Sequence, residues 1–123
     1  MKKGDVYLMD LDFEYKLWKN RLDCFLKEID IVKARNTEMT KYHPAKDMNT
    51  VEIMVLEEHE AQLHHLLNKI KVQEQELQYY NKDFPITQTH EYMSIHMKIR
   101  NKMEQMCALH LDKLDDISRA LSI

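Results

Sequence analysis

The residues best suited to chemistry in this sequence are histidines that fall on apolar helical stripes. His59 lies between Leu56 and Leu63 at spacings of three and four residues, and His110 follows Met106 at a spacing of four. Imidazoles inside a helical bundle either bind a metal or small ligand, or form buried hydrogen bonds that fix the register of the helices. His59 and His110 are therefore candidates both for binding a metal or small ligand and for forming a buried hydrogen bond.

The spacings that mark common metal sites in bundles are missing. No Glu-x-x-His occurs, although di-iron carboxylate bundles carry it on two helices. No His-x-x-x-His occurs either, so no two histidines share one helical face in that way. We interpret His59 and His110 as a polar core layer beside Ile29, with no cofactor. The alternative is a metal- or small-ligand-binding bundle that uses these two histidines.

A second polar layer follows from the same antiparallel register. The register that pairs His59 with His110 also pairs Gln73 with His96, and Tyr15 falls at their level. Tyr15, Gln73 and His96 can satisfy one another's hydrogen bonds without a ligand. We therefore predict a second structural polar layer rather than a binding site.

Burial gives the His59–His110 layer a predicted pH dependence. Burial disfavours the imidazolium, and a neighbouring imidazolium repels it, so both pKa values should lie below about 6.5. Stability should then fall in mild acid. A carboxylate that reaches the layer, such as Glu28, would reverse the sign.

Catalytic motifs are absent from the sequence. Gly4 is the only glycine, which excludes the glycine-rich phosphate loops and the nucleophile elbow. No Ser/His/Asp or Cys/His arrangement has sequence support, and Cys24 is an isolated thiol. We expect that the protein is not an enzyme.

Composition and charge restrict the partners. The chain of 123 residues fits one domain, and its formal net charge is −3 with both signs scattered along it. No basic stripe suits nucleic acid, and no run of 18 apolar residues suits a membrane span. We expect a cytoplasmic protein that binds neither nucleic acid nor membrane.

Apolar residues at spacings of three and four predict three helices, near residues 6–37, 49–81 and 88–121. Asp5 and Thr87 are expected N-caps, and Asn49 with Glu52 has the spacing of a capping box. Pro44 should break the chain between the first two helices. The matched lengths predict an all-α, antiparallel up-down-up three-helix bundle with coiled-coil-like heptad packing.

The third helix carries more apolar residues than one core stripe can bury. We call the surplus the flank stripe; it consists of Met93, Met97, Cys107, Leu111, Leu114 and Leu121. An exposed apolar stripe rimmed by charge is typical of an interface. We expect it to form a homodimer or to dock another helical protein. The alternative is an irregular bundle in which a loop covers the stripe.

The first helix resembles the opening helix of short, uncharacterised bacterial helical-bundle proteins. The resemblance rests on the run Tyr15–Leu22, followed by Phe25 and by Glu28-Ile29. It implies a bacterial, cytoplasmic origin and carries no activity, cofactor or catalytic residue. The leading hypothesis is therefore a structural or protein-interaction bundle that self-associates or docks a partner helix.

Overall fold

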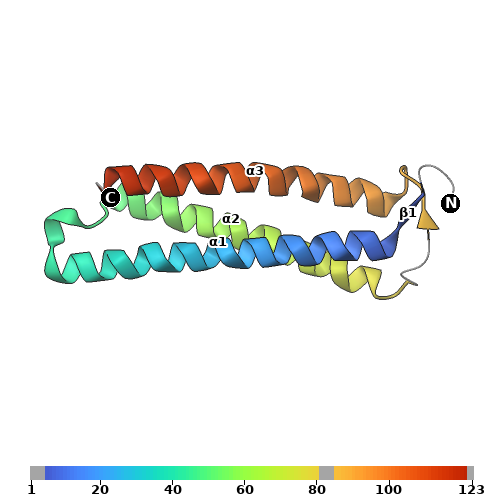
Figure 1. Cartoon of the computed structure of the whole chain (residues 1–123), viewed down its shortest axis with the longest axis horizontal. Helices are drawn as coiled ribbons and strands as arrows, with labels where there is room; N and C mark the ends of the chain where they lie inside the picture. Colours follow the sequence, from blue (N-terminus) through green and yellow to red (C-terminus); the bar gives the residue numbers. More distant parts are fainter. Residues whose placement is uncertain (1–4, 81–84, 122–123) are drawn as a thin grey trace.

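The computed structural model describes residues 5–80 and 85–121, and in these ranges it is a three-helix bundle (Figure 1). The three long helices are α1 (Leu8–Tyr42), α2 (Thr50–Leu77) and α3 (Glu91–Ala120). A short 3-10 helix, η1 (Pro44–Lys46), lies between α1 and α2. The all-α, up-down-up architecture predicted from the heptad spacing is confirmed.

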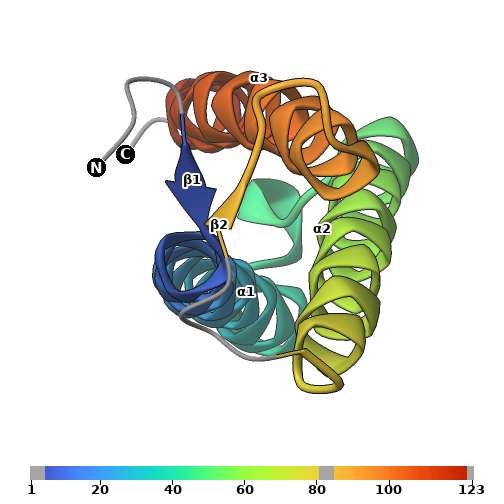
Figure 2. The same cartoon turned by 90° about the vertical axis from the view of Figure 1, so that its right-hand side faces the viewer.

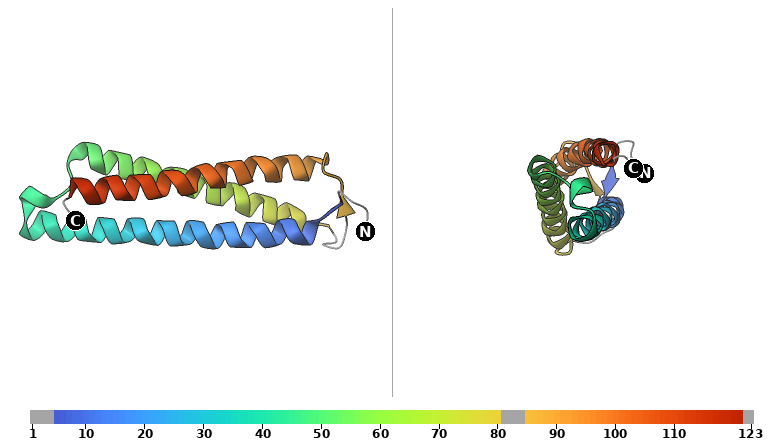
Figure 3. Two further views of the ribbon diagram at one scale, coloured as in Figure 1. Left: turned by 45° about the horizontal axis from the view of Figure 1, so that its top comes forward. Right: turned by 90° about the vertical axis from the view of Figure 1, so that its left-hand side faces the viewer.

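The three helices are not parallel to one another along their whole length. Figure 1 and Figure 3 show α2 inclined across the other two helices. It begins beside the end of α3 and ends beside the start of α1. The end-on view in Figure 2 shows that the three helices surround a common interior. α1 and α3 run in the same direction, and they share an outer face on the side away from α2 (Figure 2).

Residues on the predicted stripes fill this interior. Leu22, Ile29, Leu63 and Met106 are fully buried, as the heptad spacing requires. The remaining buried apolar residues are Leu8, Leu11, Tyr15, Trp18, Met48, Leu56, Leu66, Leu67, Ile70, Leu77, Ile86, Met93, Ile99, Met103 and Ile117.

The connection between α1 and α2 confirms the sequence signals. Proline lacks an N–H and disfavours helix in the residue before it, and α1 ends at Tyr42, two residues before Pro44. The Asn49 side chain accepts a hydrogen bond from the Glu52 N–H, and the Glu52 carboxylate accepts one from the Asn49 N–H. This reciprocal pair is the expected capping box, and it starts α2 at Thr50.

The opposite end of the bundle differs from the sequence prediction. Residues Val6–Tyr7 (β1) and Pro85–Ile86 (β2) form a short antiparallel pair, which joins the start of α1 to the segment before α3. The N-caps are Tyr7 and His90, so the expected caps Asp5 and Thr87 are wrong. The strand β1 follows Asp5 directly, so α1 begins only after Tyr7. Thr87 follows the strand β2, and a turn closed by the His90 N–H to the Thr87 carbonyl separates it from α3. The predicted helix break at residues 81–84 lies outside the described residues.

None of the described helices combines the length and the apolar character that crossing a membrane requires.

Candidate functional site

A hydrogen-bonded chain of three side chains crosses the bundle from its surface to its core. The Oε1 atom of Glu28 lies 3.1 Å from the Nε2 atom of His110. The Nδ1 atom of His110 lies 2.9 Å from the Nε2 atom of His59. Both imidazoles are fully buried, whereas the Glu28 side chain is 48% exposed. The predicted His59–His110 layer is therefore present, and it has a third member.

The Glu28 carboxylate determines the tautomers of the two histidines. An ionised carboxylate only accepts hydrogen bonds, so His110 donates its Nε2–H to Glu28. The His110 Nδ1 atom then holds a lone pair and accepts the Nε2–H of His59. The Nδ1 atom of His59 is left unprotonated. It is buried and has no hydrogen-bond partner among the described residues.

The surroundings of His59 oppose a positive charge. Burial lowers the pKa of His59 to about 4, and the nearby His110 and Lys113 lower it in the same direction. The His110 ring is stacked between neutral partners, with its centroid 4.1 Å from that of Phe25 and 5.1 Å from that of His59. His59 is therefore held in its neutral form near pH 7.

A second cluster lies two heptads earlier on both α1 and α3. The Nε2 atom of His96 lies 3.0 Å from the Oε1 atom of Glu14, and Arg100 forms an ion pair with the same oxygen. The imidazole of His96 is stacked on Trp18 at 4.8 Å and meets the edge of Tyr15 at 4.7 Å. The predicted contact between Tyr15 and His96 is present.

The electrostatics of the second cluster follow from burial and pairing. Burial lowers the pKa of His96, although the Glu14 carboxylate offsets part of this effect. Burial alone would raise the pKa of Glu14, but hydrogen bonds to His96 and Arg100 hold it below its usual value. The Nδ1 atom of His96 is buried and unpartnered within the described residues. Gln73 is half-buried beside a surface hollow, so this third predicted member does not complete the layer there.

From the sequence, Glu28 was named only as a carboxylate that could reach the layer and Glu14 was not named, although a signal for both exists. Glu14 and Glu28 are separated by two heptads, as are His96 and His110. Because α1 and α3 run in the same direction, equal spacings place both Glu–His pairs at matching levels. Helical angle alone could not assign the glutamates, because they lie at the edge of the α1 stripe.

Two buried carboxylates were also missed. Glu74 on α2 is buried and pairs with Lys19 of α1, with 2.7 Å between Oε1 and Nζ. Asp12 is buried and forms an ion pair with Lys16 one turn later. Only the Glu74 pair joins α1 to the end of α2, because Asp12 and Lys16 both lie on α1. The spacing of apolar residues predicts neither of these polar contacts.

A metal ion between His59 and His110 would have as ligands the two nitrogen atoms that face each other, Nε2 of His59 and Nδ1 of His110. In the described part of the chain, no group of three or more His, Cys, Asp or Glu side chains is placed to hold a metal ion. Structural zinc sites require four such ligands. The short distance between the two nitrogens is that of a direct hydrogen bond.

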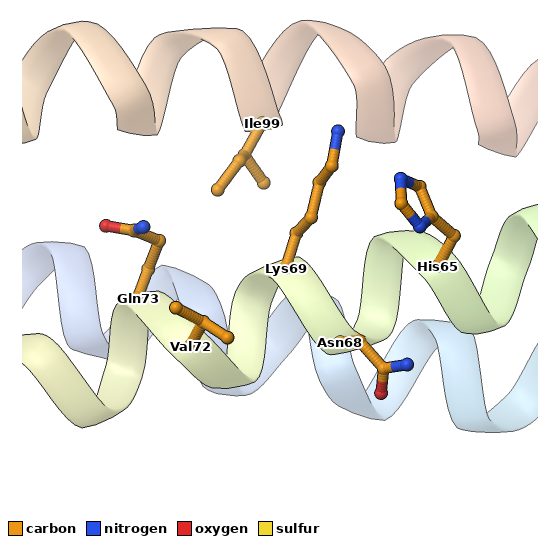
Figure 4. A pocket seen from close by; sticks show the side chains of 6 residues that line it. All are labelled: His65, Asn68, Lys69, Val72, Gln73 and Ile99. Atoms are coloured by element: carbon orange, nitrogen blue, oxygen red, sulfur yellow. The ribbon is translucent and has the colours of Figure 1, made fainter.

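A hollow of ≈ 390 Å³ opens between α2 and α3 (Figure 4). Its lining combines the apolar Val72 and Ile99 with the basic Lys69 and His65. Figure 4 shows Lys69 and His65 reaching from α2 toward α3, while Ile99 extends from α3 toward α2. Neither orphaned histidine nitrogen belongs to a residue of this lining.

The structure divides the flank stripe of α3. Met93 lies in the core and takes no part in the surface. Met97 and Leu111 are exposed, whereas Cys107, Leu114 and Leu121 are half-buried. A surface with both exposed and half-buried apolar residues therefore remains along α3.

Comparisons of this chain with protein-family models, with curated proteins and with solved structures find no match.

Proposed function

We propose that the protein is an interaction module that forms a homodimer through the outer face shared by α1 and α3. The observation that carries the proposal is the apolar surface left on this face. Leu111 is 61% exposed and Met97 is 37% exposed. The half-buried Cys107 lies between them along α3, and the half-buried Leu114 and Leu121 extend the surface beyond Leu111. Exposed apolar surface rimmed by charge is typical of a protein interface.

The neighbouring side of α1 extends this surface. Glu14 and Glu28 mark the side of α1 that contacts α3, since both bond to histidines of α3. The exposed residues Leu17 and Ile31 each lie three positions after one of these glutamates, on the same side of the helix. The apolar face is therefore two helices wide, which suits packing against a second helical pair.

The charges on this face favour a second copy of the chain. A hollow of ≈ 400 Å³ between α1 and α3 is lined by two acids, Glu14 and Glu104, and two bases, Arg21 and Arg100, above Trp18, Met103 and Cys107. A twofold axis brings the same patch from each subunit together, so a surface with both signs complements itself. A partner of one charge sign fits this mixture less well.

Light scattering at micromolar concentration tests the proposal with matched variants. The double substitution Met97→Glu with Leu111→Glu places charges at two exposed sites and should give a folded monomer. The control, Val72→Glu, changes an exposed apolar residue on α2 and should leave the dimer intact. A wild-type monomer, or equal loss of dimer in both proteins, would contradict the proposal. Circular dichroism verifies that each variant is folded.

A further inference from the structure

A second apolar surface lies at the opposite side of the bundle, where α2 begins and α3 ends. Two adjoining hollows share Val51 and Val55 in their linings. The larger, of ≈ 510 Å³, adds Met54, and the smaller, of ≈ 240 Å³, adds Ile117 and Ala120 of α3. Val51 is 68% exposed and Met54 is 62% exposed. We call this surface the α2 groove.

The α2 groove is rimmed by carboxylates. Glu57 and Glu58 border the larger hollow, and Glu52 and Asp116 border the smaller one. Lys113 is the single cation in the lining of these two hollows. The rim is therefore strongly biased toward negative charge, unlike the mixed rim on the α1–α3 face.

One of these carboxylates has an unused acceptor. The Oε1 atom of Glu52 accepts the Asn49 N–H in the capping box. The Oε2 atom is shielded from solvent and has no hydrogen-bond partner among the described residues. Because this oxygen is shielded, a partner does not reach it in this conformation, and the exposed carboxylates Glu57, Glu58 and Asp116 carry the accessible negative charge of the rim.

We propose that the α2 groove binds a basic amphipathic helix of a partner protein. The apolar side of such a helix would cover Val51, Met54 and Val55. Its Lys or Arg side chains would pair with the exposed carboxylates of Glu57 and Glu58. This mode is helix-in-groove recognition, in which apolar anchors give affinity and rim charges select the partner.

The charges further along α2 also favour a basic helix as the partner of the α2 groove. About two to four turns beyond Glu58 on α2, the hollow in Figure 4 is lined by Lys69 and His65 and by no carboxylate. A basic helix is thus attracted at the start of α2 and not beyond it. The contrast limits the site to residues near Val51–Glu58.

The experiment uses two synthetic helical peptides of about 15 residues, long enough for about four turns. One carries Leu on one side and Lys on the other, and the second replaces every Lys by Glu. Fluorescence anisotropy of labelled peptide measures binding to the full chain. The Leu/Lys peptide should bind at least tenfold more tightly than the Leu/Glu peptide, and added salt should weaken it.

Variants locate the site. Met54→Asp should weaken binding of the Leu/Lys peptide about tenfold, by removing an apolar contact. Glu57→Lys with Glu58→Lys should reverse the preference between the peptides. Val72→Asp is the matched control on the same helix and should leave binding unchanged. Equal affinity for both peptides, no binding of either, or equal losses in Met54→Asp and Val72→Asp would overturn the proposal.

A further variant separates this proposal from the dimer. Met97→Glu with Leu111→Glu should bind the Leu/Lys peptide as the wild type does, because these residues lie on the α1–α3 face. Loss of binding in that variant would show that the two surfaces are one, and would overturn a separate site. Failure of the dimer alone leaves the peptide result intact.

Discussion

The protonation of His59 is governed by burial and by the charges around it. Glu28 of α1 faces the outer nitrogen of His110, and Lys113 of α3 opposes a charge on His59. The Lys33–Glu60 ion pair connects α1 to the residue after His59. The structure combines both conditions considered from the sequence, since the histidines are buried and a carboxylate reaches them.

The sign of the pH dependence follows from the pKa of His59. Its folded value of about 4 lies below the unfolded value of 6.5, so the unfolded chain binds the proton more tightly. The stabilisation is complete above about pH 6.5 and is lost as the pH falls toward 4. Denaturant melts should show that the wild type loses about 1 kcal/mol between pH 7.5 and pH 5.5 from this residue.

The double substitution His59→Leu with His110→Leu should flatten this dependence. It removes both imidazoles, and the exposed Glu28 left behind can be hydrated. A wild type that gains stability at pH 5.5 would mean that the Glu28 carboxylate outweighs burial. Identical pH dependence in the two proteins would contradict the role of His59.

The Glu14 carboxylate should contribute more to the stability of the fold than an ordinary surface glutamate does. Glu14→Ala leaves the Nε2–H of the buried His96 without an acceptor, which costs about 1–3 kcal/mol. Glu38→Ala, on the exposed part of α1, is the control and should change stability by less than about 0.5 kcal/mol. Equal effects in chemical denaturation would show that the Glu14–His96 bond contributes nothing.

At the scale of the helices, the capping box fixes where α2 begins. Asn49→Ala removes the acceptor for the Glu52 N–H and should cost about 1 kcal/mol. Asn101→Ala, within α3 and exposed, replaces asparagine by a better helix former and should not destabilise. Thermal melts of the two variants compare them directly. A stability loss at Asn101 as large as that at Asn49 would contradict the cap.

The end of α1 and the start of α2 could be predicted, because each depends on one or two residues close to it in the sequence. Pro44 and the Asn49–Glu52 box act within a few residues, and both were confirmed. The start of α3 follows a turn and is capped by the His90 side chain, a residue outside the usual N-caps. The start of α1 was not predictable either, because it follows the pairing of Val6 with Ile86 across the chain. Such a pairing leaves no periodic pattern in the sequence.

The candidate site was predictable in its core but not at its edge. His59, His96 and His110 lie on the stripes that apolar spacing defines, so their burial and the contact between His59 and His110 could be predicted. Glu14 and Glu28 are half-buried or exposed polar residues, and only the fold shows which of many glutamates reaches a histidine.

At the scale of the whole molecule, the described residues include two separate apolar surfaces, the α1–α3 face and the α2 groove. The α1–α3 face carries charges of both signs, whereas the α2 groove is acidic. The first suits a second copy of the chain and the second suits a basic helix. A dimer would therefore present two α2 grooves, and we infer a protein that brings partner helices together.

Sedimentation equilibrium of the wild type across micromolar concentrations tests the central claim most directly. The mass of one chain is 14.9 kDa. Self-association through the α1–α3 face predicts an average mass that rises with concentration toward twice this value. It also predicts that Met97→Glu with Leu111→Glu stays at the mass of one chain throughout. A wild type that remains at the mass of a single chain at every concentration would contradict the account.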